Sequence, residues 1–514
     1  AVVGSGFAGS LLAMIARRQG RSVILLEKGR HPRFAIGESS TPLSNLLLED
    51  LALRYNLPGI APLAKWGTWM QTYPNLDCGL KRGFTFYHHE FGRHAARSPE
   101  RRDQLLVAAS PHDAIADTHW HRADFDQHFV HEARKTGVDY LDEVDLREAA
   151  EHDEEIRLRG QRHGKEIAIR ARFVVDATGP RGFLHRALGL TELSLPDFPP
   201  TQALFTHFRG VRRLEDLLDE NRAGQPYPVD DAAVHHVFEG GWIWVLRFRG
   251  GVTSAGVAAV DSLAARLRLS EGAPAWERLL RQLPTVRDQF AGTTLERPFT
   301  YAPRLAFRSG NAAGRRWALL PSAAGFVDPL LSTGFPLVLL GVTRLAGILE
   351  DHWDTAQWSD ELARYARLTS GDLLATAKLI GALYASMNNF PLFVSLSLLY
   401  FATASFAETA RRLGKPHLAG SFLLHEHPGF QGKLDELLTR ARLPQNEASA
   451  GQLASDILHA IEPFNVAGLG NPERRNWYPV EAGDLLGAAR KVEATREDVM
   501  QLLDHCGFWA TIAD

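Results

Sequence analysis

The chain has 514 residues, of which 45% are hydrophobic and 23% charged, and its formal net charge is −3. This composition is typical of a globular protein with room for two or three domains or subdomains. The small net charge gives no general field that would attract nucleic acid, so we expect no nucleic-acid partner. Cys78 and Cys506 are the only cysteines, which argues against a disulfide framework and favours a cytoplasmic protein.

Residues 1–30 predict a strand, a glycine-rich turn, a helix and a second strand. Gly4, Gly6 and Gly9 form a GxGxxG turn after an apolar run, and Glu27 closes the second apolar run. In such a unit the glycines permit a tight turn, close approach of a pyrophosphate and helix–strand packing. The helix N-terminus supplies N–H groups for phosphates, and the acid accepts hydrogen bonds from ribose hydroxyls. The residues that we assign to this end of a dinucleotide site are Gly4, Gly6, Phe7, Ala8, Gly9, Glu27 and Lys28.

The next elements lead to a second run of small residues. Residues 31–105 predict loops and short strands, because they are rich in Pro, Gly, His and aromatic residues. Residues 123–137 predict a helix, with apolar residues at every fourth position. Strand-like pieces fill 144–175 and end in Asp176-Ala177-Thr178-Gly179. Ligands of doubly wound sheets bind beyond the carboxyl ends of strands, so these small residues leave room for a cofactor.

A third segment completes the pattern after a β-rich stretch at 200–260. Residues 317–334 read as a strand, tiny residues and a turn, before a helix that begins near Phe335. Backbone N–H groups of this turn are suited to a flavin ring or a small anion. Alone, either later segment is more often a tight structural turn. The three segments together, in this order and over this length, favour bound FAD.

From Phe335 onward the pattern is mostly helical, and it includes a long apolar stretch. Residues 379–407 carry no charge, which is long enough for a membrane span. Asn388, Asn389 and Pro391 divide this stretch into two shorter pieces. We therefore expect a buried helical hairpin, or an apolar wall beside a substrate site, and regard a membrane partner as unlikely.

These motifs resemble the FAD fold shared by flavin-dependent halogenases, aromatic hydroxylases and geranylgeranyl reductases. Gly37-Glu38-Ser39 and the stretch Ala323 to Pro329 belong to the resemblance, beside the glycine turn and the Asp176–Gly179 run. It implies an α/β fold (α+β overall): a Rossmann-like FAD-binding domain over 1–345, with an inserted antiparallel sheet at about 60–110 and 195–290. Residues 346–514 would form a C-terminal, mostly helical region.

Three features are similar to the halogenase branch of this fold. Trp242-Ile243-Trp244 matches the first half of the halogenase WxWxIP signature, and Ser332-Thr333-Gly334 matches the loop that holds chloride. Lys81 stands about where halogenases place their catalytic lysine. The resemblance implies that reduced FAD, O2 and chloride or bromide give hypohalous acid, which reaches an electron-rich aromatic substrate through Lys81.

The resemblance also implies roles for individual residues. Ser332, Thr333 and Gly334 would bind halide, and Trp242 and Trp244 would form a wall between flavin and substrate. No metal is expected. The further residues that would bind FAD are Glu38, Ser39, Arg122, Asp176, Gly179, Ser322, Gly325, Asp328 and Gly334.

The chain departs from the family pattern at three places. Leu246-Arg247 replaces the Ile-Pro of the signature, and Pro321-Ser322 stands where many relatives have Gly-Asp, whose carboxylate binds the ribityl chain. Leu331 occupies the position of the glutamate of tryptophan halogenases. Free tryptophan is therefore not the expected substrate, and phenolic, pyrrolic or carrier-bound acceptors remain open. Because the sequence has no second nucleotide-binding unit, we expect a separate flavin reductase to supply reduced FAD.

Other interpretations of the same residues remain open. Lys81 beside Arg82 is also compatible with a solvated surface charge, and two alternating tryptophans are often only core. The histidine pairs at 88–89 and 119–121 lack partners at metal-ligand spacing. At the level of function, the alternatives are an FAD-dependent monooxygenase, an isoprenoid double-bond reductase, or an FAD-binding protein without halogenase chemistry.

Overall fold

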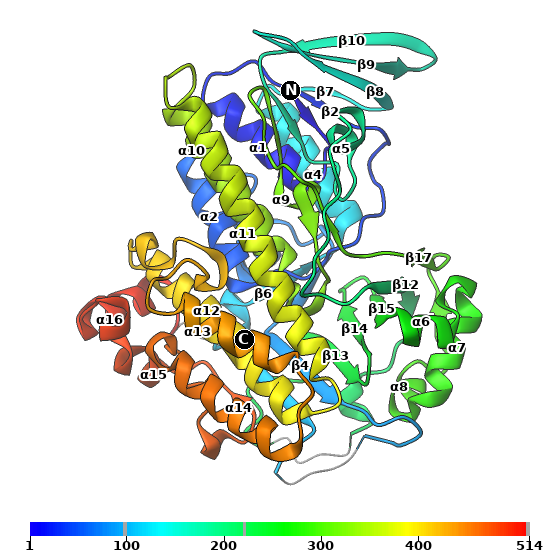
Figure 1. Cartoon of the computed structure of the whole chain (residues 1–514), viewed down its shortest axis with the longest axis vertical. Helices are drawn as coiled ribbons and strands as arrows, with labels where there is room; N and C mark the ends of the chain where they lie inside the picture. The colour runs from blue at the N-terminus through cyan, green and yellow to red at the C-terminus, as the bar shows by residue number, and fades with distance from the viewer. Residues whose placement is uncertain (96–99, 219–222, 510–514) are drawn as a thin grey trace.

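The computed structural model describes residues 1–95, 100–218 and 223–509. At the upper end of the molecule (Figure 1) lies a parallel five-stranded sheet, and α1 (Phe7–Arg18) packs against α4 (Arg122–Lys135) and α10 (Gly334–Asp351). The predicted strand–turn–helix–strand unit at the N-terminus is confirmed. The strands, in spatial order, are β19 (Trp317–Leu319), β11 (Val174–Asp176), β1 (Val2–Val3), β2 (Ile24–Leu26) and β7 (Asp139–Leu141).

Two smaller ribbons and a three-stranded sheet accompany the parallel sheet. The three-stranded sheet consists of β8 (Val144–Glu151), β9 (Ile156–Arg162) and β10 (Lys165–Ala171). The ribbons pair β3 (Cys78–Lys81) with β6 (Asp117–Trp120), and β18 (Phe307–Arg308) with β20 (Gly325–Phe326). The β3–β6 ribbon brings the predicted lysine strand beside the segment that leads into α4.

A nine-stranded sheet forms the lower part of the molecule and contains the segments expected as an insertion. It is mixed rather than antiparallel throughout, because residues 233–237 pair in parallel with 84–88, and residues 477–478 pair in parallel with 106–107. It extends past the predicted limit at 290, and one of its edge strands comes from the C-terminal region. The strands, in spatial order, are β16 (Thr294–Leu295), β12 (Thr201–Arg209), β15 (Val252–Val260), β14 (Gly241–Arg247), β13 (Ala233–Phe238), β4 (Gly83–His88), β5 (Gln104–Ala108) and β21 (Trp477–Tyr478), with β17 (Thr300–Ala302) also pairing with β12.

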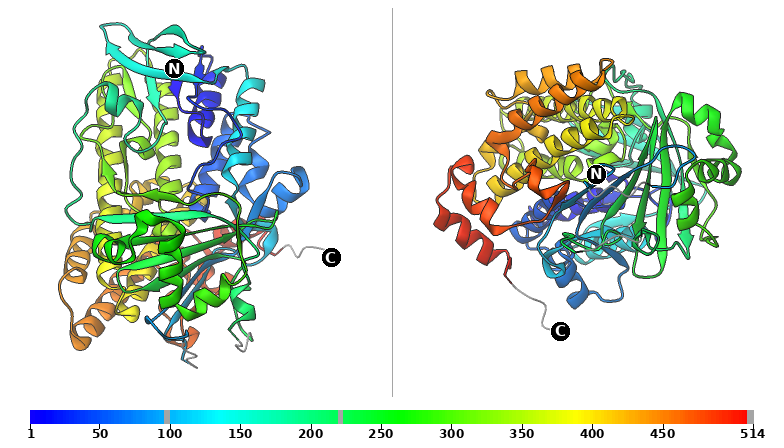
Figure 2. Two further views of the ribbon diagram at one scale, coloured as in Figure 1. Left: turned by 90° about the vertical axis from the view of Figure 1, so that its right-hand side faces the viewer. Right: turned by 90° about the horizontal axis from the view of Figure 1, so that it is seen from below.

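The two faces of this sheet are covered by different helices. Ile243 and Val245 on β14 belong to the core under α6 (Asp261–Leu267), α7 (Ala273–Gln282) and α8 (Pro284–Gln289). Trp242 and Trp244 belong to the other core, which they share with the long helices, because successive side chains of a strand alternate between faces. Figure 2 shows the green strands between these two groups of helices.

Long helices join the two ends of the molecule. The predicted domain boundary at 345/346 is wrong, because α10 runs unbroken through it and packs on α1 and α2 (Pro42–Arg54). The predicted helical hairpin is confirmed: α11 (Trp358–Ala385) and α12 (Phe390–Arg412) meet at a turn where Asn389 caps α12 by accepting a bond from the Leu392 N–H.

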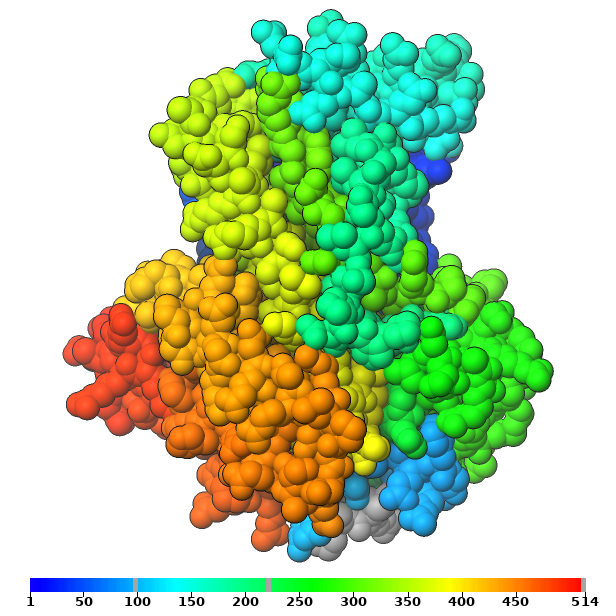
Figure 3. Space-filling view, viewed as in Figure 1, coloured from blue at the N-terminus to red at the C-terminus, as the bar shows by residue number. Residues whose placement is uncertain are grey.

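By length and composition, the helical stretches Leu330–Asp351 and Phe390–Arg412 would each suffice to cross a membrane. The apolar window of the second is 83% buried inside the protein, which is typical of a core helix. Figure 3 shows the C-terminal helices, in orange and red, on the flank opposite the green elements. The remaining helices are α3 (Trp66–Thr72), α5 (Phe183–Ala187), α9 (Pro321–Ala324), α13 (Gln431–Ala441), α14 (Glu447–Ile461), α15 (Ala482–Gly487) and α16 (Arg496–His505).

Candidate active site

At Gly4 and Gly9, the glycine turn between β1 and α1 is packed too closely for a side chain. Gly4 has φ +99°, and a Cβ there would lie 2.6 Å from the Ala177 carbonyl oxygen. A Cβ on Gly9 would lie 2.0 Å from the Gly4 carbonyl oxygen. The first and second small-residue segments of the sequence therefore lie against each other at the end of the parallel sheet.

Glu27 fixes the shape of this turn. Its carboxylate accepts bonds from the Ser5 N–H (3.0 Å), the Ser5 hydroxyl (2.9 Å) and the Gly29 N–H (2.9 Å), and Arg33 pairs with it at 3.2 Å. Burial alone would raise the pKa of Glu27, but Arg33 and these donors hold it below its ordinary value. Glu27 is thus an anion that orders the loops around the turn.

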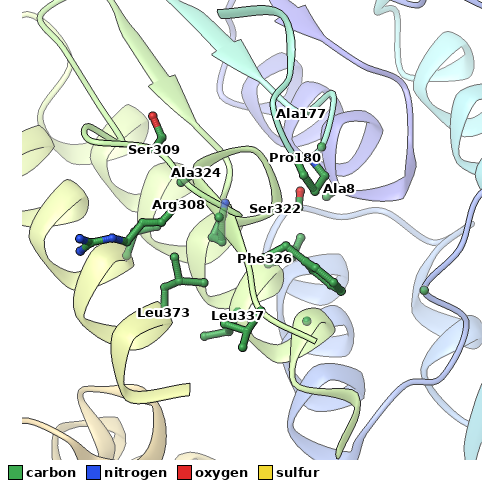
Figure 4. Close-up of a pocket in the computed structure, with 18 of the residues that line it drawn as sticks. Ala8, Ala177, Pro180, Arg308, Ser309, Ser322, Ala324, Phe326, Leu337 and Leu373 are labelled. Carbon is green, nitrogen blue, oxygen red and sulfur yellow. The ribbon is translucent and has the colours of Figure 1, made fainter. Parts of the chain in front are cut away.

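A cavity of about 710 Å³ opens beyond the glycine turn, and we call it the cofactor cavity. Figure 4 shows Ala8, Pro180 and Ser322 around one part of it, with Leu373 of α11 on the other side. All three sequence segments that predict FAD contribute to its lining. The predicted residues that line it are Gly6, Phe7, Ala8, Gly9, Arg122, Gly179, Ser322, Gly325, Asp328, Thr333 and Gly334.

Arg122 begins α4 and braces the cavity wall. It forms a bidentate pair with Asp126 (2.9 and 2.8 Å) and donates to the Ile36 and Gly37 carbonyls. Asp126 also accepts a bond from the Phe7 N–H at 3.1 Å, at the start of α1. The sequence prediction missed Asp126, although its i,i+4 spacing from Arg122 is a recognisable signal.

Six predicted cofactor residues lie outside the cofactor cavity lining: Glu27, described above, Glu38 and Ser39, which line a second cavity, and Asp176, Lys28 and Gly4. Asp176 is buried and accepts bonds from the Thr178 N–H and hydroxyl and from the Leu184 N–H, so its carboxylate holds the neighbouring loop. Lys28 is exposed and pairs with Asp145 at 3.0 Å. Gly4, as described above, is enclosed by backbone.

A second cavity of about 150 Å³ adjoins the first, and both are lined by Gly334, Phe326 and Phe335. Trp242 and Trp244 lie side by side in its wall, with ring centroids 5.6 Å apart. We call it the wall cavity. The other predicted residues that line it are Glu38, Ser39, Ser332 and Gly334.

Asp328 ties the tryptophan wall to the helical hairpin. Its carboxylate accepts bonds from the Trp242 indole N–H (3.2 Å), the Tyr384 hydroxyl (2.9 Å) and the Leu330 N–H (3.0 Å). Burial raises the pKa of Asp328 to about 6, although these donors oppose the shift. The wall is therefore held in place from α11.

The Ser-Thr-Gly turn lies at the start of α10. Leu331 and Ser332 have φ +62° and +54°, in the left-handed region that non-glycine residues rarely adopt. Thr333 precedes the helix without a side-chain capping bond, and the first N–H groups of a helix have no acceptor within it. The N-terminus of this 18-residue helix therefore presents donors beside both cavities.

Lys81 is fully buried, so the interpretation as a solvated surface charge is wrong. Its ammonium group donates to the Ser40 carbonyl and lies 3.8 Å from the centroid of the Phe84 ring. Rings continue from Phe84 to the wall: Phe84 and Phe86 stack on His235, with ring centroids 5.9 and 4.4 Å away, and His235 stacks on Trp242 at 5.3 Å. Packed aromatic groups thus connect Lys81 with the wall cavity.

Asp117 and His119 share one face of the β3–β6 ribbon with Lys81. Asp117 lies directly opposite Lys81, and His119 lies opposite Gly79. Burial lowers the pKa of Lys81 while Asp117 opposes this shift, and burial raises the pKa of Asp117 while Lys81 opposes it. Burial and the Lys81 charge also lower the pKa of His119 to about 3, so its ring is neutral. The sequence prediction missed both partners.

The histidines raised as metal candidates have other surroundings. His89 shares a hydrogen bond with His236 at 2.9 Å, and His121 bonds Asp124 at 2.9 Å. Across the described ranges, no three His, Cys, Asp or Glu side chains are grouped as they would be around a metal ion.

Residues 1–304 match the model of the FAD dependent oxidoreductase family. The chain belongs to this family. It is 29% identical to the tetracycline 7-halogenase of Kitasatospora aureofaciens, over 77% of this chain and 71% of that relative. It is 27% identical to the monodechloroaminopyrrolnitrin halogenase PrnC of Pseudomonas fluorescens, over 68% of this chain but only 60% of that relative's length.

Solved halogenases share the fold of this FAD-dependent oxidoreductase. Halogenase PltM matches with a TM-score of 0.81 and 23% identity, over 92% of this chain and 98% of that one. Its complex with phloroglucinol and FAD matches with a TM-score of 0.73, over 99% of this chain and 98% of that one. The resemblance to flavin-dependent halogenases is therefore confirmed.

The residues of this oxidoreductase fit FAD. Arg308 Nε, at the cofactor cavity, is buried and has no hydrogen-bond partner among the described residues. Within the same described ranges, Glu38 Oε2 and Ser39 Oγ at the wall cavity are also buried and unpartnered. Buried polar atoms are normally satisfied, so these three indicate a polar ligand. Together with a glycine turn that has no room for a Cβ at Gly4 or Gly9, they agree with a cofactor that extends from the turn to the tryptophan wall.

Proposed function

We propose that the protein is a flavin-dependent halogenase that acts on an electron-rich aromatic compound. The observation that carries the proposal is the placement of Lys81, which is fully buried and joined by stacked rings to the tryptophan wall. A buried amine without a catalytic task would be an expensive feature of a core. When bound, reduced FAD supplies the activation of O2 that oxidises halide to hypohalous acid.

Chloride or bromide is the co-substrate in this proposal, held by Ser332, Thr333 and Gly334. The donors at the start of α10 favour an anion, because helix N-termini carry partial positive charge. Their position beside Phe326 and Phe335 keeps the halide where the two cavities adjoin.

Trp242 and Trp244 keep the aromatic substrate away from the flavin, and Lys81 receives the oxidant beyond them. The amine of Lys81 either donates a hydrogen bond to hypohalous acid or carries the halogen as a haloamine. From the haloamine, which forms with loss of water, a C–X bond forms on the ring, the N–X bond breaks and the ring proton returns to the amine. From hypohalous acid, a C–X bond forms on the ring and the O–X bond breaks. The ring proton leaves with the hydroxide as water, so atoms and charge balance.

The acceptor is phenolic, pyrrolic or carrier-bound in this proposal. The relatives support this range, since one is a 1H-pyrrole-2-carbonyl-[peptidyl-carrier protein] chlorinase of Pseudomonas fluorescens at 24% identity, over 66% of this chain and 72% of that relative. Because the sequence carries one nucleotide-binding glycine unit, a separate flavin reductase supplies the reduced FAD.

The test supplies the purified protein with reduced FAD, O2, bromide or chloride, and a panel of phenols and pyrroles. Mass spectrometry is expected to show products that gain halogen, and Lys81→Ala is expected to lose them while still binding FAD. Lys135→Ala is the matched control, because Lys135 is exposed and pairs with Glu132 on the surface of α4.

Two results would overturn the proposal. One is the absence of halogenated product from every acceptor, and the other is a Lys81→Ala variant that halogenates as well as the parent. Halide-independent turnover with NADPH would instead favour a monooxygenase or an isoprenoid double-bond reductase on the same fold.

A further inference from the structure

We infer that Asp117 positions the acceptor, by accepting a hydrogen bond from the ring O–H or N–H of a neutral, single-ring aromatic compound. This inference rests on the proposed halogenase function and deepens it. It concerns a third cavity, of about 190 Å³, which we call the acceptor cavity.

The acceptor cavity lies between the nine-stranded sheet and the C-terminal helices. Phe84 on β4 of this sheet and Asp117 on β6 of the β3–β6 ribbon line one side, and Tyr400 and Phe401 on α12 line the other. The Phe84 and Phe401 ring centroids are 5.0 Å apart. The same Phe84 ring lies beneath the Lys81 ammonium, so the cavity reaches the immediate surroundings of the lysine.

One carboxylate oxygen of Asp117, which lines the acceptor cavity, accepts no hydrogen bond from the described residues. Its Oδ1 accepts a bond from Asn45 Nδ2 at 2.8 Å, and Asn45 also donates to Ser40 Oγ at 3.1 Å. Its Oδ2 is buried, and no hydrogen bond reaches it from any described residue. The residue is only 5% exposed. A buried carboxylate oxygen without a donor is costly, and a donor on a bound ring would satisfy it.

The charges of the lining favour a neutral acceptor. Its two cations are already paired, Lys65 with Glu49 at 2.6 Å and Arg412 with Glu408 at 2.8 Å. With Asp117 and Glu481, carboxylates outnumber cations in the described lining. A carboxylate or phosphate on the acceptor would meet repulsion there, whereas an O–H or N–H donor is attracted.

The size of the cavity favours a single ring. An apolar protein cavity of about 150 Å³ is sufficient to hold benzene, whereas drug-sized ligands occupy about 300–1,000 Å³. At about 190 Å³ the acceptor cavity takes one ring with small substituents. The substrate of the tetracycline 7-halogenase relative is a four-ring compound and would not fit.

The test compares two isomers, 4-methylphenol and methoxybenzene, which have the same atoms but differ in the hydroxyl donor. Their dissociation constants are measured by calorimetry on the FAD-loaded protein. We expect the parent to bind 4-methylphenol at least about tenfold more tightly, as a hydrogen bond to a charged group provides. Asp117→Asn is expected to reduce this preference to within about threefold, because the charge is lost.

Asp113→Asn is the matched control. Asp113 shortly precedes β6 in the sequence, but its carboxylate accepts a hydrogen bond from Arg82 outside the acceptor cavity. It is expected to keep the preference. Equal binding of the two isomers by the parent would overturn the inference without any variant, and so would an unchanged preference in a folded, FAD-binding Asp117→Asn protein. Tetracycline that displaces 4-methylphenol would overturn the size argument.

The outcomes separate this inference from the proposed function. Selective binding of the phenol without any halogenated product would leave the inference standing and overturn the function. Halogenated products together with equal binding of the two isomers would overturn the role of Asp117 alone.

Discussion

Lys81 and Asp117 lie directly opposite each other on two antiparallel strands, and both side chains are buried. Each opposes the effect of burial on the pKa of the other. Removal of one member leaves the other as an isolated buried group, so the pair must be tested as a unit.

Lys81→Met is expected to lower the free energy of unfolding by about 3 kcal/mol at pH 8, because Asp117 then remains as an uncompensated buried anion. The pKa of Asp117 is already raised above its ordinary value of 3.8 and rises further in the variant. The native state then binds the proton that the unfolded state has released, so stability falls as pH rises above about 4. Chemical denaturation at pH 5 and pH 8 measures this.

The loss is therefore expected to shrink at pH 5, where Asp117 takes up a proton. Adding Asp117→Leu to Lys81→Met is expected to restore most of the stability at pH 8, because an apolar pair needs no counter-charge. A loss of the same size at both pH values would contradict this account of the pair.

Gly9→Ala is expected to lower the free energy of unfolding by about 2–3 kcal/mol and to weaken FAD binding, because its Cβ would lie 2.0 Å from the Gly4 carbonyl oxygen. Gly451→Ala in the exposed part of α14 is the control, since its Cβ meets no atom within 4 Å. The free energy of unfolding of the control is expected to rise by about 0.5–1 kcal/mol. Equal effects of the two changes would argue against close packing at the turn.

Ser322→Asp is expected to bind FAD about tenfold more tightly than the parent. Ser322 lines the cofactor cavity (Figure 4), and a carboxylate there would accept charge-assisted hydrogen bonds from ribityl hydroxyls. Ser322→Asn, which adds the same bulk without charge, is expected to gain less. Calorimetric titration with FAD measures the difference, and an aspartate variant no better than the asparagine variant would refute the charge argument.

Asp328→Asn is expected to change the pH dependence of stability. The pKa of Asp328 is raised by burial from 3.8 to about 6, so the native state binds more protons than the unfolded state between these values. The free energy of unfolding of the parent therefore falls by about 2–3 kcal/mol between pH 4 and pH 7 through Asp328. The asparagine variant lacks this contribution. Unfolding free energies of both proteins across this range would reveal it, and parallel curves would count against the assignment.

The cofactor half of the site could be predicted from the sequence because its determinants are local. Gly4, Gly6 and Gly9 act within one turn, and the small residues after β11 and β19 follow strands that the apolar runs indicate. The residue types in each segment indicate the local backbone conformation that the segment needs. Their assembly then follows from the rule that neighbouring parallel strands end at the same edge of a sheet.

The partners of Lys81 could not be predicted in this way. Asp117 and His119 meet it only because β6 pairs with β3 in one particular register, and a shift of one residue would turn both side chains to the other face. The acceptor cavity likewise combines β4 with α12, which lie some three hundred residues apart along the chain. The local sequence around Asp117 does not predict which helix packs over it.

The hairpin of α11 and α12 serves two cavities at once. The first helix contributes Thr369, Leu373 and Thr376 to the cofactor cavity, and the second contributes Tyr400 and Phe401 to the acceptor cavity. A chimera that exchanged the C-terminal helices for those of a relative would therefore replace part of the cofactor cavity together with part of the acceptor cavity. Variants designed to accept other aromatic substrates should therefore substitute single side chains on α12 and keep both helices of the hairpin.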